Sequence, residues 1–256
     1  MSGAMEIAAI GLRAQQRALE AIAGNISNIN TPAFKRSGMR FAALVRASAA
    51  DRAHGGDPVD GAAVSGVAQW AQPMIDQQGQ VERTGGSLDL AIDGRGFIEL
   101  MGPAGRTLLW RGGTLRVLDD GQLAASSGLV LKAGITVPRD AAGIRIDRDG
   151  KVHALTGEDR GGSEIGQIAL VTLDGGSAVE RLDDGVYAVG DDVELSDAAA
   201  DEGGMGHLVQ GALERSNVDL NDEMVGMLVT QRAYAANAQV VRAIDEFLSL
   251  ANGLRR

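Results

Sequence analysis

Few residues in this sequence have the types and spacing that catalysis or metal binding requires. The three histidines, His54, His153 and His207, lie in separate regions, without a His-x-x-x-His pair or a carboxylate at metal-ligand spacing. The chain contains no cysteine, which excludes disulfides, thiolate zinc sites, iron–sulfur clusters and thiol nucleophiles. We therefore expect no metal site and no cofactor.

Two short motifs resemble ligand sites but are incomplete. Gly94-Arg95-Gly96 supplies the first two glycines of a dinucleotide-binding fingerprint, but Glu99 occupies the third position and a strand pattern follows. We interpret it as a hairpin turn. Asp147-Arg148-Asp149-Gly150 opens like a calcium loop, yet the later carboxylates and the closing glutamate are missing. No serine-nucleophile or phosphate-loop motif occurs, so we predict that the protein is not an enzyme.

Composition describes a folded chain with many turns. Its 256 residues are 45% hydrophobic and 23% charged, and they include 36 glycines but only 3% aromatic residues. This balance predicts tight turns around an aliphatic core. Charge interrupts every apolar run before the length of a transmembrane helix, and the N-terminus lacks the pattern of a cleaved secretory signal.

The net charge of −10 is concentrated in the middle of the chain. Residues 1–45 hold five basic and two acidic residues, and residues 208–256 hold five basic and six acidic residues. The remainder carries 14 basic and 26 acidic residues. An acidic middle repels nucleic acid and anionic lipid, so we expect neither as a partner, and we expect no small-molecule substrate.

The N-terminal segment has the periodicity of an amphipathic helix. Met5, Leu12, Leu19 and Ile26 recur at heptad spacing, which is typical of a coiled-coil seam. The helix should end near Asn28 to Pro32, because asparagines favour turns and proline restricts the residue before it.

The C-terminal segment repeats this pattern. Leu220 opens a heptad row that continues through Met227, Tyr234, Val241 and Leu248. Ser216, Asn217 and Asp219 are candidate N-caps for this helix. A second apolar row widens its face, which indicates more than one packing partner.

Between the two helices the hydrophobic period changes to two. Residues 88–92 and 97–101 flank Asp93-Gly94, and further Asp-Gly pairs fall at 120/121, 149/150 and 184/185. Such pairs favour tight hairpin turns between short strands. We expect other strands at 115–118, 144–146, 165–173 and 186–189.

The predicted fold class is therefore α+β, with paired N- and C-terminal coiled-coil-like helices bracketing a central antiparallel β domain. We assign residues 1–45 to the N-terminal helix and the loop after it, 66–195 to the β-rich domain, and 208–256 to the C-terminal helix. Residues 46–65 and 196–207 are interpreted as connectors. Because both helices have more apolar surface than one mutual seam needs, we expect copies of the chain to assemble.

Three segments resemble one known family. Residues 24–35 resemble the N-terminal signature of the bacterial flagellar axial proteins of the rod and hook, with Ala33 at the usual glycine. Residues 88–97 are similar to a strand-turn-strand motif of rod proteins, and residues 211–234 resemble the C-terminal signature of the family. The signature positions are Asn25, Asn28, Thr31, Phe34, Lys35, Asp93, Gly94, Gly96, Phe97, Ser216, Asn217, Gln231 and Arg232.

The resemblance implies a structural subunit of the flagellar basal-body rod, the drive shaft of the motor. Length and the Gln231-to-Tyr234 helix resemble the distal rod subtype most, and the proximal rod subtype is the alternative. The resemblance implies export through the flagellar type III apparatus without signal cleavage, a location in the rod that spans the periplasm, and assembly into a hollow tube that transmits torque to the hook. The implied partners are copies of the chain, other rod and hook proteins, the export apparatus and the surrounding periplasmic rings.

We assign the heptad residues to packing between helices, either inside one subunit or between subunits: Leu12, Leu19, Ile26, Met227, Tyr234, Val241 and Leu248. Asn25, Asn28 and Thr31 could satisfy backbone groups at the helix end or bridge to a neighbouring subunit, and the local role is the preferred interpretation. A free-standing envelope module that binds peptidoglycan or sugar is the competing class. It would not need two strongly apolar termini.

Overall fold

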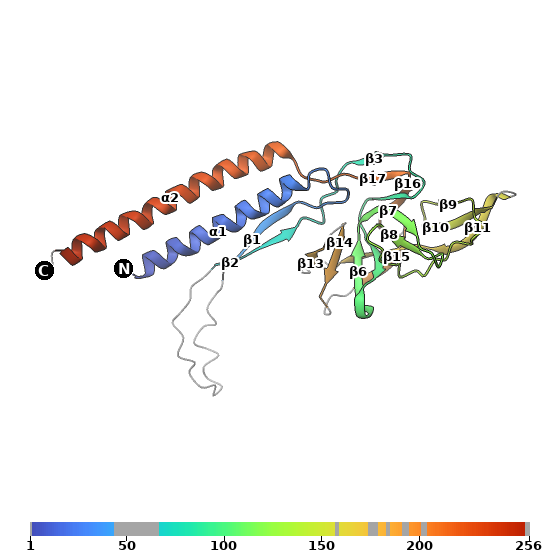
Figure 1. Cartoon of the computed structure of the whole chain (residues 1–256), viewed down its shortest axis with the longest axis horizontal. Helices are drawn as coiled ribbons and strands as arrows, with labels where there is room; N and C mark the ends of the chain where they lie inside the picture. Colours follow the sequence, from blue (N-terminus) through green and yellow to red (C-terminus); the bar gives the residue numbers. More distant parts are fainter. Residues whose placement is uncertain are drawn as a thin grey trace, which may run out of the picture. The chain divides into compact units, whose positions relative to one another are not determined.

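The computed structural model describes residues 2–43, 67–156, 159–173, 179–182, 185–190, 195–200 and 204–253 (Figure 1). The fold is α+β, with one helix at each end of the chain and antiparallel strands between them. Unit 1 comprises Met1–Ala23, Gly38–Gln72 and Met224–Arg256, and unit 2 comprises Gly24–Ser37 and Pro73–Glu223. The predicted connector 46–65 lies outside the described residues. No helix in the described ranges is long and apolar enough to cross a membrane.

The end of α1 and the start of α2 lie close to the turn and cap residues that the sequence indicates. α1 (Ser2–Ser27) ends just before the asparagine-rich turn. α2 (Leu220–Gly253) starts directly after Asp219. The Asp219 Oδ1 atom accepts hydrogen bonds from the backbone N–H groups of Asn221, at 2.8 Å, and Asp222, at 3.2 Å. Asp219 is therefore the N-cap of α2, one of the three predicted candidates.

Two close approaches show that α1 and α2 run antiparallel. A Cβ atom added to Gly226 would lie 3.6 Å from Ile22 Cδ1, and one added to Gly11 would lie 2.8 Å from Asn237 Nδ2. The contact therefore moves toward the end of α2 as it moves toward the start of α1 (Figure 1). Small residues at these positions let the two backbones come close. Strands β1 (Ser37–Ala43) and β2 (Val67–Pro73) pair as a separate two-stranded sheet.

Two four-stranded sheets form the centre of unit 2. The first has the order β16 (His207–Gln210), β4 (Asp89–Asp93), β7 (Gly112–Val117) and β8 (Leu123–Ala125). The second has the order β13 (Val179–Arg181), β14 (Val186–Val189), β6 (Thr107–Trp110) and β5 (Ile98–Met101). All pairings within both sheets are antiparallel.

Smaller sheets complete unit 2. β11 (Asp159–Gln167), β10 (Lys151–Thr156) and β9 (Gly143–Ile146) form a three-stranded sheet. β12 (Ala169–Leu173) pairs with β15 (Leu195–Ala199), and β17 (Ala212–Glu214) pairs with β3 (Val81–Arg83). A short 3₁₀ turn, η2 (Pro103–Gly105), precedes β6.

The core of unit 2 is mostly aliphatic, as the composition predicts. One large cluster joins Leu90 and Ile92 of β4 to Leu100, Trp110 and Leu123 from neighbouring strands. A second, smaller cluster is built around Phe97 and Tyr187, whose rings meet edge to face at 5.7 Å. β4 is paired on both sides, which explains why its three central residues are all buried.

Some Asp-Gly turns form hairpins as predicted and one does not. Asp120-Gly121 joins β7 to β8 and Asp149-Gly150 joins β9 to β10. Gly185 precedes β14 in the β13–β14 hairpin, although Asp184 lies outside the described residues. The prediction for Gly94-Arg95-Gly96 is wrong: β4 and β5 lie in different sheets, and this segment carries the chain from one sheet to the other. An Asp-Gly pair indicates a turn, but it does not show whether the strands on either side of the turn pair with each other.

The β-rich region is longer than the sequence predicted. Most of β15 and the first residue of β16 lie in the predicted connector 196–207, and the rest of β16 and all of β17 lie in the segment 208–256 that was assigned to the C-terminal helix. β16 pairs with β4 along its full length, from His207 opposite Asp93 to Gln210 opposite Leu90. The expected single strand at 165–173 is also divided between β11 and β12 in separate sheets. Strands this short contain too few alternations to be told from loops.

Candidate functional site

The turn after α1 is stabilised by two of the signature side chains. Asn28 Nδ2 donates to the carbonyl of Gly24 at 2.9 Å, which also accepts the Asn28 N–H at 3.2 Å at the helix end. Thr31 Oγ1 donates to Asn28 Oδ1 at 3.1 Å. Both contacts lie within the turn, in agreement with the preferred local interpretation of these two residues.

Asn25 instead reaches distant segments of the same chain. Its Oδ1 atom accepts from the Ser37 N–H at 2.8 Å, and its Nδ2 atom donates to the Ser37 carbonyl at 3.0 Å and to Glu223 Oε1 at 3.2 Å. Glu223 also pairs with Arg36, whose Nε lies 2.5 Å from the same oxygen. The Met74 N–H donates to the Arg36 carbonyl at 2.8 Å. Four separate segments therefore meet at one buried polar cluster at the border of unit 2.

The backbone of residues 33–34 is bonded to distant segments of the same unit 2. The Ala33 N–H donates to the Glu214 carbonyl at 2.7 Å, and the Asn217 N–H donates to the Phe34 carbonyl at 3.3 Å. Phe34 is buried, and the Arg181 guanidinium lies 4.1 Å from its ring centroid. Ala33 has φ 56°, a left-handed conformation that favours glycine. This chain therefore keeps that backbone shape with an alanine at the position where the family signature has glycine.

Lys35 is the most deeply buried charged residue of the signature. Its side chain is 0% exposed, and Nζ donates to Glu214 Oε1 at 2.6 Å and to the Gln77 carbonyl at 2.8 Å. Glu214, with 1% of its side chain exposed, also accepts from the Gly79 N–H at 2.7 Å and from Arg111 Nε at 2.9 Å. Burial lowers the pKa of Lys35, and the Glu214 carboxylate opposes that shift. One carboxylate thus holds two buried cations from distant parts of the chain.

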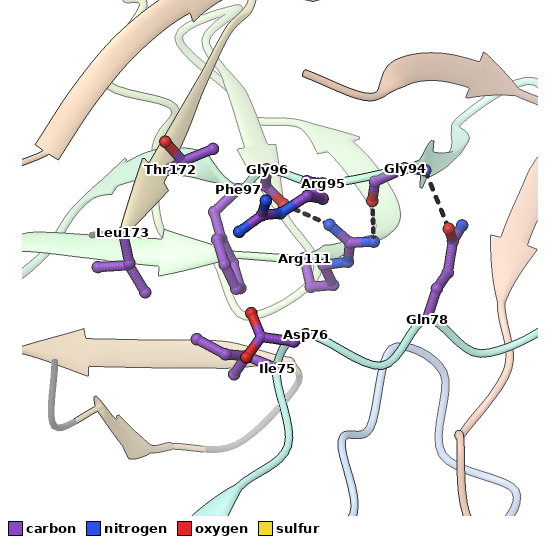
Figure 2. Close-up of a pocket in the computed structure, with 10 residues that line it drawn as sticks. All are labelled: Ile75, Asp76, Gln78, Gly94, Arg95, Gly96, Phe97, Arg111, Thr172 and Leu173. Atoms are coloured by element: carbon purple, nitrogen blue, oxygen red, sulfur yellow. Dashed lines mark hydrogen bonds between the residues drawn. The ribbon is translucent and has the colours of Figure 1, made fainter. Parts of the chain in front are cut away.

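The Gly94–Gly96 segment is fixed by Arg111. Its Nη1 atom donates to the Gly96 carbonyl and its Nη2 atom to the Gly94 carbonyl, each at 2.5 Å (Figure 2). Gly94 has φ 111°, and a Cβ added there would lie 2.6 Å from Gly206 Cα, so only glycine fits. Phe97 then forms an antiparallel bridge with Val171. Arg111 thereby links this crossover between sheets to Glu214.

The remaining signature residues have smaller roles within the chain. Asn217 Oδ1 accepts from the Arg36 N–H at 2.6 Å, so Asn217 helps to hold the signature loop. Ser216 Oγ accepts from the Val218 N–H at 3.3 Å, and Asp93 Oδ1 accepts from Gln78 Nε2 at 3.2 Å. Gln231 and Arg232 are exposed on α2.

Most of the predicted heptad residues are half-buried in the single chain. Half-buried positions are Leu12, Leu19, Ile26, Met227 and Val241. Tyr234 differs, because 43% of its surface is exposed. The Leu248 side chain lies outside those the structure describes.

Sequence reasoning did not single out Arg111, Glu214, Glu223 or Arg36 as functional residues. Arg111 directly follows the apolar strand β6, and Glu214 directly follows the apolar residues of β17. A charged residue at the end of an apolar run was therefore the sequence signal that could have identified these two residues. Among the described residues, no three His, Asp or Glu side chains come together in a group that could hold a metal ion.

Comparison with known proteins identifies the family of this chain. A model of the flagella basal body rod protein matches residues 5–35, a flagellar hook protein FlgE/F/G D1 domain model matches residues 91–154, and a flagellar basal body rod FlgEFG protein C-terminal model matches residues 209–254. The flagellar basal-body rod protein FlgG of Caulobacter vibrioides is 33% identical, over 98% of this chain and 99% of the relative. The chain belongs to the flagellar basal-body rod family.

Two further relatives extend the similarity over the whole rod protein. FlgG of Agrobacterium fabrum is 33% identical over 96% of this chain and 97% of its own length. FlgG of Borreliella burgdorferi is 31% identical over 100% of both chains. The rod protein is a structural subunit rather than an enzyme, it is part of the basal-body rod, and family membership implies assembly with other flagellar rod and hook proteins.

Proposed function

We propose that this rod protein is a distal rod subunit, and that many copies assemble into a hollow tube which transmits torque to the hook. The observation that carries the proposal is the apolar surface of α2. Eight large apolar side chains of this helix are between 43% and 69% exposed: Leu220, Met224, Val225, Leu228, Val229, Tyr234, Val240 and Phe247. Such a surface on a long helix favours contact with other subunits.

In the proposed tube, the terminal helices of neighbouring copies pack around the central channel as coiled coils, and the β-rich units form the outer wall. Leu19 and Met227 are half-buried in the single chain. Their remaining surface is then covered by a neighbour. In such a head-to-tail contact, one face of a subunit binds a different face of the next subunit. The contacts then build an open filament rather than a closed ring.

The distal position is supported by the full-length similarity to rod proteins named FlgG. We further propose that the subunit leaves the cytoplasm through the flagellar type III apparatus without cleavage of a signal, and that it contacts the surrounding rings in the periplasm. Mass spectrometry of the subunit from purified basal bodies tests the export route, because cleavage would shorten its N-terminus.

Electron microscopy of basal bodies tests the rod assignment. Basal bodies would be purified from a strain that lacks this gene and from the same strain with the gene restored. We expect rods that stop short of the hook in the first strain and complete rods in the second. A rod that stops near the inner membrane would indicate a proximal subunit, and complete rods and hooks without the gene would contradict the proposal.

A further inference from the structure

A small cavity in unit 2 combines an apolar wall with positive charge. It has a volume of about 110 Å³. Ile75, Phe97 and Leu173 supply apolar surface, and Arg95, Arg111 and Asp76 supply charged groups (Figure 2). A volume of this size accommodates a short side chain rather than a cofactor. Its lining is suited to a group with an aliphatic stem and a charged end.

Arg111 provides the buried donor of the cavity. Only 3% of its side chain is exposed, and its hydrogen bonds are those to Glu214, Gly94 and Gly96. A guanidinium carries five N–H donors, so these three bonds leave two N–H groups on the Nη atoms. A guanidinium N–H that remains unused can donate to a carboxylate oxygen in a charge-assisted hydrogen bond.

Charge around the cavity is unbalanced in the positive direction. Lys35 and Arg111 are both buried and share the single buried carboxylate of Glu214. Arg95 is exposed beside the cavity and adds a third cation. Asp76 is the opposing charge; it is exposed, and its field partly restores the pKa of Lys35 that burial lowers. Among the described charged side chains that line the cavity, the two cations Arg95 and Arg111 therefore outnumber the one carboxylate, Asp76.

We propose that this cavity binds a carboxylate on a short aliphatic stem, supplied by an acidic side chain of a second copy of this chain. The stem would lie on Phe97 and Leu173, and the carboxylate would accept hydrogen bonds from Arg111 and pair with Arg95. The chain offers such groups in excess, since it has 34 acidic against 24 basic residues. That the carboxylate comes from a second copy of the chain rests on the proposed self-assembly. That the cavity binds a carboxylate does not rest on it.

Titration of the full-length protein with butyrate tests the cavity. The readout is the NMR signal of the arginine Nε–H groups, and butylamine serves as the oppositely charged control. We expect saturable binding of butyrate that weakens about three- to tenfold in Arg95→Gln and tightens by a similar factor in Asp76→Asn, because both changes act through a partly screened charge. Arg116→Gln, an exposed arginine of β7, is the matched control and should change nothing. Equal responses to butyrate and butylamine, or no effect of Arg95→Gln and Asp76→Asn, would overturn the carboxylate site.

Sedimentation of the same variants tests the source of the carboxylate. If a second copy supplies the carboxylate, Arg95→Gln weakens self-association and added butyrate inhibits the self-association of the wild type. Arg116→Gln should self-associate as the wild type does. Normal self-association of Arg95→Gln together with butyrate binding by the wild type would overturn the second copy as the source and leave a free acid. If the wild type does not self-associate at all, the proposed assembly fails, and butyrate binding still decides whether the cavity is a carboxylate site.

Discussion

Replacing Glu214 by glutamine removes the only buried carboxylate between Lys35 and Arg111, and we expect it to lower the free energy of unfolding by about 3–5 kcal/mol. Glutamine keeps the size of the side chain and one oxygen that can accept from the Gly79 N–H. It removes the negative charge that both cations share. The change therefore tests the charge of the cluster rather than its packing.

The magnitude follows from how Lys35 can respond. A charged ammonium with 0% exposure and no carboxylate would cost several kcal/mol, but the lysine can instead lose its proton. Deprotonating a lysine with an ordinary pKa of 10.5 at pH 7 costs about 5 kcal/mol, at 1.36 kcal/mol per pH unit, which limits the loss from Lys35. Arg111 cannot deprotonate and still has its two carbonyl partners, so its contribution is smaller.

Urea-induced unfolding followed by circular dichroism measures this loss. Glu82→Gln is the matched control, because Glu82 makes an exposed pair with Arg215 at 3.4 Å and should lose under about 0.5 kcal/mol. The double variant Lys35→Met with Glu214→Gln should be more stable than Glu214→Gln alone, since the unpaired lysine is gone. A loss below about 1 kcal/mol in Glu214→Gln, or no recovery in the double variant, would refute the buried-charge argument.

Further predictions concern the signature loop, the buried tyrosine, the helices and the β-rich unit. Ala33→Gly should change the free energy of unfolding by less than about 1 kcal/mol, because glycine relieves the strain of the left-handed φ but loses a buried methyl group and makes the unfolded chain more flexible. Ala33→Val should lower the free energy of unfolding by over about 2 kcal/mol. Thermal unfolding of both variants checks this. Burial raises the pKa of Tyr187 above its ordinary 10.0, so above pH 10 the unfolded state loses the tyrosine proton while the folded state keeps it. The free energy of unfolding should therefore fall as the pH rises above 10. Tyr187→Phe should reduce this fall, as measured by urea unfolding at alkaline pH. Leu19→Asp or Met227→Asp should abolish tube formation in electron micrographs while leaving unit 2 folded by NMR, since both residues are half-buried in unit 1 and are assigned to packing between helices. A fragment of residues 66–195 should fail to fold cooperatively in calorimetry, because it lacks β16 and leaves β4 unpaired on one side.

Local features of the fold could be predicted from local sequence. Heptad spacing located both helices, and residue type limited the N-cap of α2 to three candidates, of which the structure shows Asp219. Asp-Gly pairs located the β7–β8 and β9–β10 hairpins. These features depend on residues a few positions apart, where the physical rules of capping and turns apply directly.

Long-range partners could not be predicted in the same way. Lys35 and Glu214 are 179 positions apart, and only the folded chain shows that the family signature residue Lys35 is buried against that carboxylate. Which sheet each strand joins is likewise decided by packing across the unit, so the Gly94–Gly96 segment was mistaken for a hairpin turn.

The border of unit 2 has a consequence for the continuity of the chain. The backbone passes between the two units after residues 23, 37, 72 and 223. The residues beside these passages are tied together: Asn25 bonds to Ser37 and Glu223, and the Met74 N–H bonds to the Arg36 carbonyl. Cleavage of any one passage by a protease would divide the chain into two peptides, but the other three passages would still connect the two units. The β-rich unit would therefore keep a peptide link to unit 1 after any single cut.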